Sequence, residues 1–223
     1  MSSIAQRLHE VKATLPQHVC LIAVSKFHPV ESLMEAYQAG QRCFGESRVQ
    51  ELQAKHEQLP ADVEWHFIGH LQTNKVKYIV PYVSMIHSVD SPRLLDEIER
   101  QAARIDRVVD CLLEVHVAQE DTKYGFSPES CIEYLTPEVL AAYPHVRFRG
   151  VMGMASFTDD DEQVKQEFEQ LKQLFDHLRS GVMGDAAYFD TLSMGMSHDY
   201  MMAIDKGSTM VRIGSTIFGS RNY

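Results

Sequence analysis

Leu21-Ile22-Ala23-Val24-Ser25-Lys26 is the stretch on which the interpretation of this chain depends. Four apolar residues and a serine predict a buried strand, and a lysine follows at its carboxyl end. A buried ammonium group is costly unless it is paired or its pKa falls, and a lysine with a lowered pKa attacks carbonyl groups. A strand-end lysine that reaches solvent is the simpler interpretation, so the rest of the chain must decide between the two.

The pattern of this first strand recurs along the whole chain. Eight mostly apolar segments alternate with helical patterns, which predicts parallel strands covered on both faces. Within 223 residues, eight such units favour an α/β fold, a single-domain (β/α)8 TIM barrel over residues 1–223 with an extra N-terminal helix. An open doubly wound sheet is the alternative, although the chain has no Gly-rich nucleotide-binding loop. The expected strands are residues 21–26, 42–46, 65–69, 85–89, 108–117, 149–155, 191–196 and 210–218.

Composition and charge exclude several classes of protein. The net charge of −10 disfavours binding to nucleic acid or to an anionic membrane, because both need a basic surface. No apolar run reaches the length of a membrane span, and the N-terminus lacks the apolar core of a signal peptide. We therefore expect a cytoplasmic monomer that binds neither nucleic acid nor a membrane.

Two histidines could suggest a metal site, and four cysteines are spread along the chain. His66 and His70 have the same strand parity, but no third ligand is evident near them in the sequence, so no metal site is expected. The four cysteines form no CxxC pair, and we expect them to be reduced, buried thiols. They are Cys20, Cys43, Cys111 and Cys131.

Polar residues follow the predicted strands, where the active sites of such barrels lie. Ser193, Gly214 and Ser215 belong to the last two strand segments and could form a phosphate cradle with the adjacent helix amino termini. Turn glycines and capping serines are the alternative explanation. Arg212 lies inside an apolar strand on the same face as Gly214, and its guanidinium needs an acceptor there. That acceptor is either a carboxylate of the protein or an atom of a ligand.

Seven motifs, spread over nearly the whole chain, add to this interpretation. They are Ala23-Val24-Ser25-Lys26, Phe44-Gly45-Glu46, His66-Phe67-Ile68-Gly69, Leu71-Gln72-Thr73-Asn74-Lys75, Leu192-Ser193-Met194-Gly195-Met196-Ser197, Gly207-Ser208-Thr209-Met210-Val211-Arg212-Ile213-Gly214 and Ile217-Phe218-Gly219. In this order, the motifs closely resemble those of the pyridoxal phosphate homeostasis proteins, the YggS/PROSC family. The resemblance implies a barrel of the alanine-racemase type (fold type III) that binds pyridoxal 5′-phosphate.

The resemblance also implies roles for individual residues. Lys26 matches the lysine that forms the internal Schiff base, and Arg212 matches the arginine that faces the pyridine nitrogen. Ser193 and the Gly214-Ser215 turn match phosphate ligands, while Ser47 and His70 are expected to contact the cofactor. Lys123 matches a second lysine of the family, which would provide a transfer site. This chain departs from the family at Ser47, where asparagine is usual, and at His28, where a lysine is common.

The same residues bear on whether the protein is an enzyme. With an arginine at the pyridine nitrogen, the cofactor ring stays largely unprotonated and is a weak electron acceptor. Racemases of this type take a second base from an additional domain, for which this chain has no residues after Tyr223. We therefore expect a carrier that passes the cofactor to apo-enzymes and has no catalytic residues of its own. The alternatives are a racemase-like enzyme whose second base is Tyr124 or Tyr200, and a phosphate-binding barrel enzyme that would be colourless.

Overall fold

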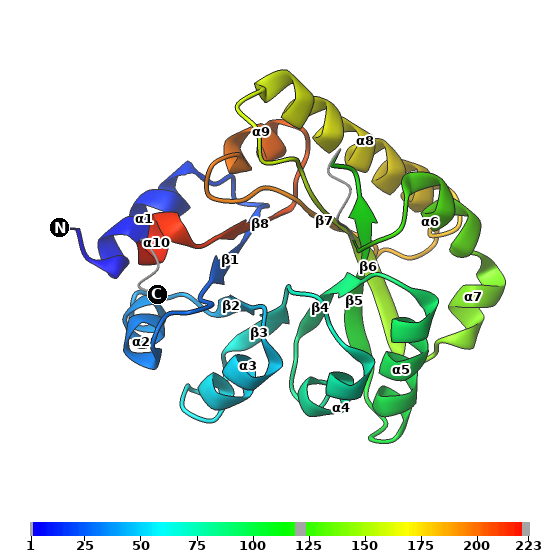
Figure 1. The fold of residues 1–223 in the computed structure, drawn as a ribbon, viewed down its shortest axis with the longest axis horizontal. Coiled ribbons are helices and arrows are strands. Elements are labelled where there is room, and N and C mark those ends of the chain that lie inside the picture. The colour runs from blue at the N-terminus through cyan, green and yellow to red at the C-terminus, as the bar shows by residue number, and fades with distance from the viewer. Residues whose placement is uncertain (1, 119–123, 220–223) are drawn as a thin grey trace.

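The computed structural model describes residues 2–118 and 124–219, and in these ranges eight parallel strands close into a barrel (Figure 1). Each strand pairs with the next along the chain, and β8 completes the ring by pairing with β1. The predicted (β/α)8 barrel is therefore confirmed. The strands are β1 (Cys20–Val24), β2 (Cys43–Glu46), β3 (Glu64–Phe67), β4 (Met85–Val89), β5 (Val109–His116), β6 (Val146–Met154), β7 (Thr191–Ser193) and β8 (Met210–Ile213).

Helices surround the barrel and connect its strands. The predicted extra helix is α1, whose apolar face packs against α2 and α10, so that the two ends of the described chain lie side by side (Figure 1). The helices are α1 (Ile4–Thr14), α2 (Val30–Gln38), α3 (Val49–His56), η1 (Thr73–Lys75), α4 (Val76–Ile79), α5 (Pro92–Ala103), α6 (Pro128–Tyr134), α7 (Pro137–Ala142), α8 (Asp161–Ser180), α9 (Tyr200–Asp205) and α10 (Ser215–Phe218).

The last two strands are shorter than the sequence pattern predicted. β7 ends at Ser193 rather than at residue 196, since Gly195 has a φ of 96° and turns the chain out of the sheet. The predicted strand 210–218 was wrong beyond Ile213, because residues 215–218 form the helix α10. Short apolar runs fit a strand or a helix equally well, and periodicity alone cannot separate them.

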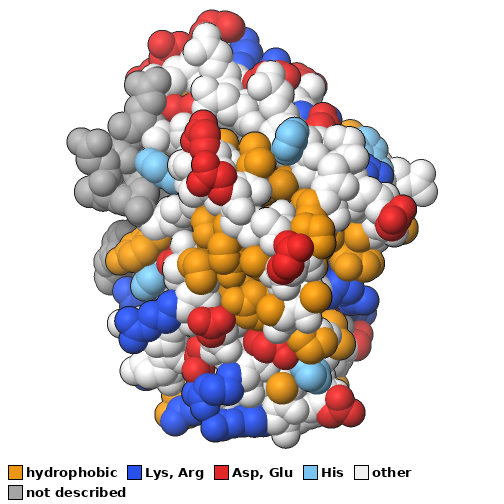
Figure 2. Space-filling view, turned by 90° about the vertical axis from the view of Figure 1, so that its right-hand side faces the viewer, with side chains coloured by type: hydrophobic (Ala, Val, Ile, Leu, Met, Phe, Trp, Pro, Cys, Tyr) orange, Lys and Arg blue, Asp and Glu red, His pale blue; other side chains and the backbone are white. Residues whose placement is uncertain are grey.

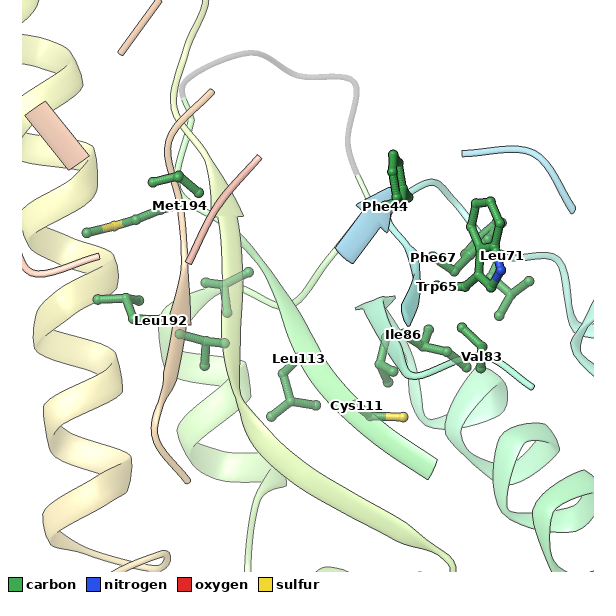
Figure 3. Packing of buried hydrophobic residues seen from close by; sticks show 14 of the residues in the cluster. Phe44, Trp65, Phe67, Leu71, Val83, Ile86, Cys111, Leu113, Leu192 and Met194 are labelled. Carbon is green, nitrogen blue, oxygen red and sulfur yellow. The ribbon is translucent and has the colours of Figure 1, made fainter. Parts of the chain in front are cut away.

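Apolar side chains form two cores, one outside the barrel wall and one within it. The outer core lies between strands and helices; there the rings of Phe44 and Trp65 have centroids 6.1 Å apart, and Cys111 packs in the same cluster (Figure 3). The inner core fills the barrel with side chains that point inward from alternate strand positions. Its buried members are Ile22, Met85, Leu112, Met152 and Met210, with Cys20 and Cys43 packed against them.

The surface has a mixed character. Figure 2 shows the face on the right of Figure 1, where hydrophobic side chains gather among acidic and basic groups. Ile132 of α6 is one of the large hydrophobic residues that are exposed in this structure. Within residues 2–118 and 124–219, no helix is both long enough and apolar enough to span a membrane.

Candidate functional site at the carboxyl end of the barrel

Lys26 lies where β1 has ended and the chain turns toward α2, at the carboxyl end of the barrel. Ser25 before it is fully buried, and Lys26 itself is partly buried. Phe27 follows with a φ of 68°, a left-handed conformation that is costly for a residue with a Cβ atom. Surrounding contacts must therefore hold this turn in place.

A second lysine, Lys55 of α3, supplies contacts of this kind. Its Nζ atom donates to the carbonyl oxygen of Ser25 over 2.8 Å, and to Oε1 of Glu46 over 2.7 Å. It also donates to Oε1 of Glu51 over 2.7 Å. Lys55 is 4% exposed and Glu46 is fully buried, so this ion pair is shielded from solvent. Buried ion pairs keep their geometry because each partner would be costly without the other.

The two carboxylates of this cluster hold both neighbours of Lys26. The Ser25 hydroxyl donates to Oε1 of Glu46 over 2.6 Å, and the backbone N–H of Phe27 donates to Oε1 of Glu51 over 2.6 Å. Burial raises the pKa of Glu46 to about 7, although the Lys55 ammonium acts to lower it. The backbone on each side of Lys26 is thus fixed by hydrogen bonds to charged or ionisable groups.

Lys55 was not among the residues expected from the sequence. Val49, Leu52 and Lys55 follow one another at intervals of three residues and form the buried face of α3. Glu51 precedes Lys55 by four residues, one helical turn away. A lysine on the apolar face of a helix is rare unless it is paired. This position, with Glu51 one turn earlier, could have identified Lys55 as a buried, paired residue from the sequence.

A chain of polar side chains crosses the interior of the barrel. Arg212 donates through Nη1 to Ser193 Oγ over 2.6 Å, and through Nη2 to the carbonyl oxygen of Gly153 over 3.0 Å. Ser193 Oγ lies 3.3 Å from His87 Nδ1, and His87 Nε2 lies 2.9 Å from His66 Nδ1. Burial lowers the pKa of His87 well below its usual value, so this imidazole is neutral.

The sequence allowed a carboxylate of the protein as the acceptor for Arg212, but the structure gives it other acceptors. Among the described residues it donates to a hydroxyl and a carbonyl group, while Glu114 and Asp199 act on it through charge at longer range. Burial lowers the pKa of Arg212 to about 10, which leaves the guanidinium charged at neutral pH. A buried cation that contacts neutral groups can attract an electron-rich ligand atom.

Gly214 lies against Val24, the last residue of β1. A Cβ atom at Gly214 would be 3.0 Å from the carbonyl oxygen of Val24, two residues before Lys26. The Gly214 N–H donates to Ser197 Oγ over 3.2 Å, and Ser215 is exposed in the first turn of α10. The structure therefore brings the predicted Gly214-Ser215 turn beside the end of β1, where Lys26 follows.

Ser47 and His70 lie after the next two strands. Both line a hollow of about 230 Å³, and a Cβ atom at Gly69 would be 2.5 Å from the carbonyl oxygen of Ser47. His70 Nδ1 lies 3.0 Å from Asp90 Oδ2, and the His70 ring stacks on Tyr124 with centroids 3.9 Å apart. Ser47 and His70 are thus brought together, whereas the predicted transfer residue Lys123 lies outside the described residues.

Comparison with known proteins places this geometry in a class. Residues 1–222 match the family model described as alanine racemase, N-terminal domain, which is the barrel class defined above. A protein of Aquifex aeolicus (strain VF5) is 43% identical over 91% of this chain and 87% of its own length. A protein of Homo sapiens is 36% identical over 99% of this chain and 82% of its own length. Both are named pyridoxal phosphate homeostasis protein, and this chain belongs to that family.

Solved structures are similar over the same range. PipY of Synechococcus elongatus PCC7942, solved with pyridoxal phosphate bound, is 36% identical with a TM-score of 0.87. The match covers 97% of this chain and all of PipY. The alanine racemase of Clostridium difficile 630 has a TM-score of 0.77 at 16% identity, and this chain covers 56% of it. At that identity the likeness shows the fold alone.

Proposed function

We propose that this protein binds pyridoxal 5′-phosphate at the carboxyl end of its barrel and carries or buffers it, which maintains the intracellular supply of vitamin B6. The observation that carries the proposal is the placement of Lys26 directly after β1, the strand whose end packs against Gly214, in a fold shared with PipY. The name of the relatives describes homeostasis of this cofactor and not a reaction.

The residues at this end of the barrel fit the cofactor. Pyridoxal 5′-phosphate would supply an aldehyde for the Lys26 amine and a phosphate dianion for nearby donors. Gly214 allows the close approach of backbone, and Ser215 lies in a helical turn whose first N–H groups have no partner within the helix. Ser193, Ser47 and His70 are the further proposed contacts, with the Ser193 hydroxyl already oriented by Arg212.

Arg212 favours binding over catalysis. A guanidinium remains protonated at neutral pH, so it would not transfer its proton to a pyridine nitrogen beside it. The ring would then be a poor electron acceptor, and proton removal from a bound amino acid would gain little from it. The hydrogen bonds of Arg212 to Ser193 and to the Gly153 carbonyl group would hold the guanidinium in place beside the cofactor ring.

A racemase-like enzyme is the alternative function, and it needs a second base. The Tyr200 hydroxyl lies 3.1 Å from Thr14 Oγ1 of α1, and Tyr124 stacks on His70. Tyr124 is 59% exposed, and a catalytic base is normally held in place by buried surroundings. Both tyrosines thus have packing or hydrogen-bonding roles, as the sequence suggested, which favours the carrier.

Transfer to other proteins completes the proposal. An aldehyde held by a reversible bond can be passed on, so the carrier would deliver the cofactor to apo-enzymes that require it. Lys123 would act as a temporary acceptor during this step. We place this activity in the cytoplasm and assign it to a monomer in which residues 1–223 form a single domain.

A transfer experiment tests the carrier against the alternatives. The protein loaded with cofactor is mixed with an apo-aminotransferase in the presence of a trap for free aldehyde. Reactivation should exceed that obtained with the same amount of free, trapped cofactor; equal reactivation would contradict delivery. Turnover of L-amino acids at about 1 per second or faster would instead establish an enzyme, and a protein that stays colourless with the cofactor would rule out both.

A further inference from the structure

A second cavity lies at the other end of the barrel, where the strands begin. Its volume is about 510 Å³, and its lining includes Cys20, Glu64, His66, Met85, Asp110 and Arg149. Cys20, Glu64 and Met85 are the first residues of their strands, whereas Lys26 follows the last residue of β1. This cavity is therefore separate from the proposed cofactor site.

A cluster of metal-ligating side chains lies at this cavity. One donor atom of each of Cys43, Glu64 and His66 lies within 4.8 Å of the other two. Strand pairing explains the cluster, because Cys43 is in register with Glu64, and His66 lies two residues further on the same face of β3. Cys20 adds a second thiol, which packs with Cys43 against the inner core.

One atom of the cluster is buried without a partner. His66 is 4% exposed, and its Nε2 atom has no hydrogen-bond partner among the described residues. Its Nδ1 atom is occupied by the 2.9 Å contact with His87 Nε2. Histidines that bind metals commonly keep their second nitrogen in such a hydrogen bond, which fixes the ring and leaves the other lone pair for the ion.

We propose that Cys43, Glu64 and His66 Nε2, with Cys20 as the fourth ligand, bind a zinc-type divalent cation at the amino end of the barrel. Two thiolates and an imidazole select zinc-type ions over magnesium or calcium, which prefer oxygen ligands. The sequence offered only the pair of His66 and His70, which the fold separates, since His70 contacts Asp90 at the opposite end.

Small movements convert this cluster into a coordination shell. Ligand atoms around a tetrahedral zinc ion lie about 3.3 to 3.8 Å apart, so the present donors must approach one another slightly. Glu64 is exposed and lines the cavity, so its carboxylate has open space in which to move, and Cys43 beside it is only partly buried. In the structure, the Cys43 thiol donates a hydrogen bond to Glu64 Oε2 over 3.4 Å. When a sulfur–metal bond forms, each cysteine releases its proton to solvent, so binding should tighten as the pH rises.

Zinc competition with a chromophoric indicator tests this site in the protein as purified, after chelator treatment and under reductant. Wild type should bind one zinc ion per chain. Cys43→Ser should weaken binding at least about 100-fold, since loss of even a supporting residue costs 10- to 100-fold. Glu64→Gln should also weaken it; as Glu64 is exposed, this variant keeps the fold even if Cys43→Ser does not.

Cys111→Ala is the matched control, because Cys111 packs in the outer apolar core (Figure 3). It should bind zinc as wild type does, and cobalt bound to wild type should show a thiolate charge-transfer band that Cys43→Ser lacks. The proposal is wrong if wild type does not compete for zinc, or if Cys43→Ser and Glu64→Gln both bind as tightly as wild type. A Cys20–Cys43 disulfide that persists under reductant and excludes zinc would also overturn it.

Discussion

The two ends of the barrel hold their polar side chains in different ways. At the carboxyl end, Lys55 is bonded to two carboxylates and a carbonyl group, which fixes the turn that carries Lys26. At the amino end, the exposed carboxylate of Glu64 lines a cavity, and His66 Nε2 has no partner in the described part of the chain. The paired groups at the carboxyl end fix the backbone around Lys26, whereas His66 Nε2 at the amino end is free to bind a ligand.

Removal of the Lys26 amine should have the largest effect. If this amine reacts with the cofactor aldehyde, borohydride reduction of the loaded wild type should fix the cofactor to the peptide that contains Lys26. Lys26→Ala should lose this labelling, whereas Cys43→Ser at the other end should keep it. Mass spectrometry of the digested protein gives the measurement. One dominant labelled site elsewhere in Lys26→Ala, for example at Lys123, would contradict the assignment.

Loss of the buried ammonium that positions the turn should come next. Lys55→Met leaves Glu46 buried without its partner, which should lower the free energy of unfolding by about 3–5 kcal/mol. Lys165→Met is the control, because its pair with Glu162 is exposed at 40% and 75% of the two side chains. That pair should contribute far less to stability, because solvent and salt screen an exposed ion pair. Urea unfolding followed by circular dichroism measures both variants, and equal losses would show that Lys55 has no special role.

A smaller change at the carboxyl end tests the proposed phosphate site. A side chain at Gly214 would press on the Val24 carbonyl oxygen at 3.0 Å and displace the turn that holds Ser215. Gly214→Val should weaken pyridoxal 5′-phosphate binding by about two orders of magnitude, since several charge-assisted hydrogen bonds are lost. Pyridoxal, which lacks the phosphate, should bind both proteins similarly. Titration of both ligands against both proteins closes a thermodynamic cycle; equal affinity of wild type for the two ligands would mean that the phosphate site is misplaced.

The smallest expected effect concerns Glu114 inside the barrel. Burial raises its pKa from 4.5 to about 7, so between these values the folded protein holds a proton that the unfolded chain has lost. The free energy of unfolding should therefore fall as pH rises from about 4.5 to 7 and then level off. Glu114→Gln should remove this part of the fall, because the glutamine cannot take up a proton.

The measurement is the free energy of unfolding against pH for wild type and for Glu114→Gln. The difference between these two curves isolates the contribution of Glu114, because the raised pKa of Glu46 lowers the free energy of unfolding over the same pH range in both proteins. Glu133→Gln, on the exposed face of α6, should leave the wild-type curve unchanged. Parallel curves for wild type and Glu114→Gln would show that Glu114 has an ordinary pKa in the folded protein.

Much of the fold could be predicted from the sequence because the relevant signals are local. Each apolar segment is followed by a helical pattern, and eight repeats of this unit leave few architectures other than a closed barrel. Lys26 and Gly214 could be proposed as site residues from the sequence, since they stand at strand ends, where such barrels bind ligands. The boundary after Ile213 was mistaken for the same reason, since a short apolar run has no local mark of strand or helix.

The sequence by itself determined which residues end the strands, and only the tertiary structure decided which residues meet across them. Periodicity assigns a side chain to a face but gives neither strand register nor the neighbours that barrel closure brings together. Lys55 could therefore be placed beside Ser25 only once α3 was packed against the barrel. Cys43 and His66 became neighbours only through the pairing of β2 with β3, because that contact depends on register and not on any local pattern.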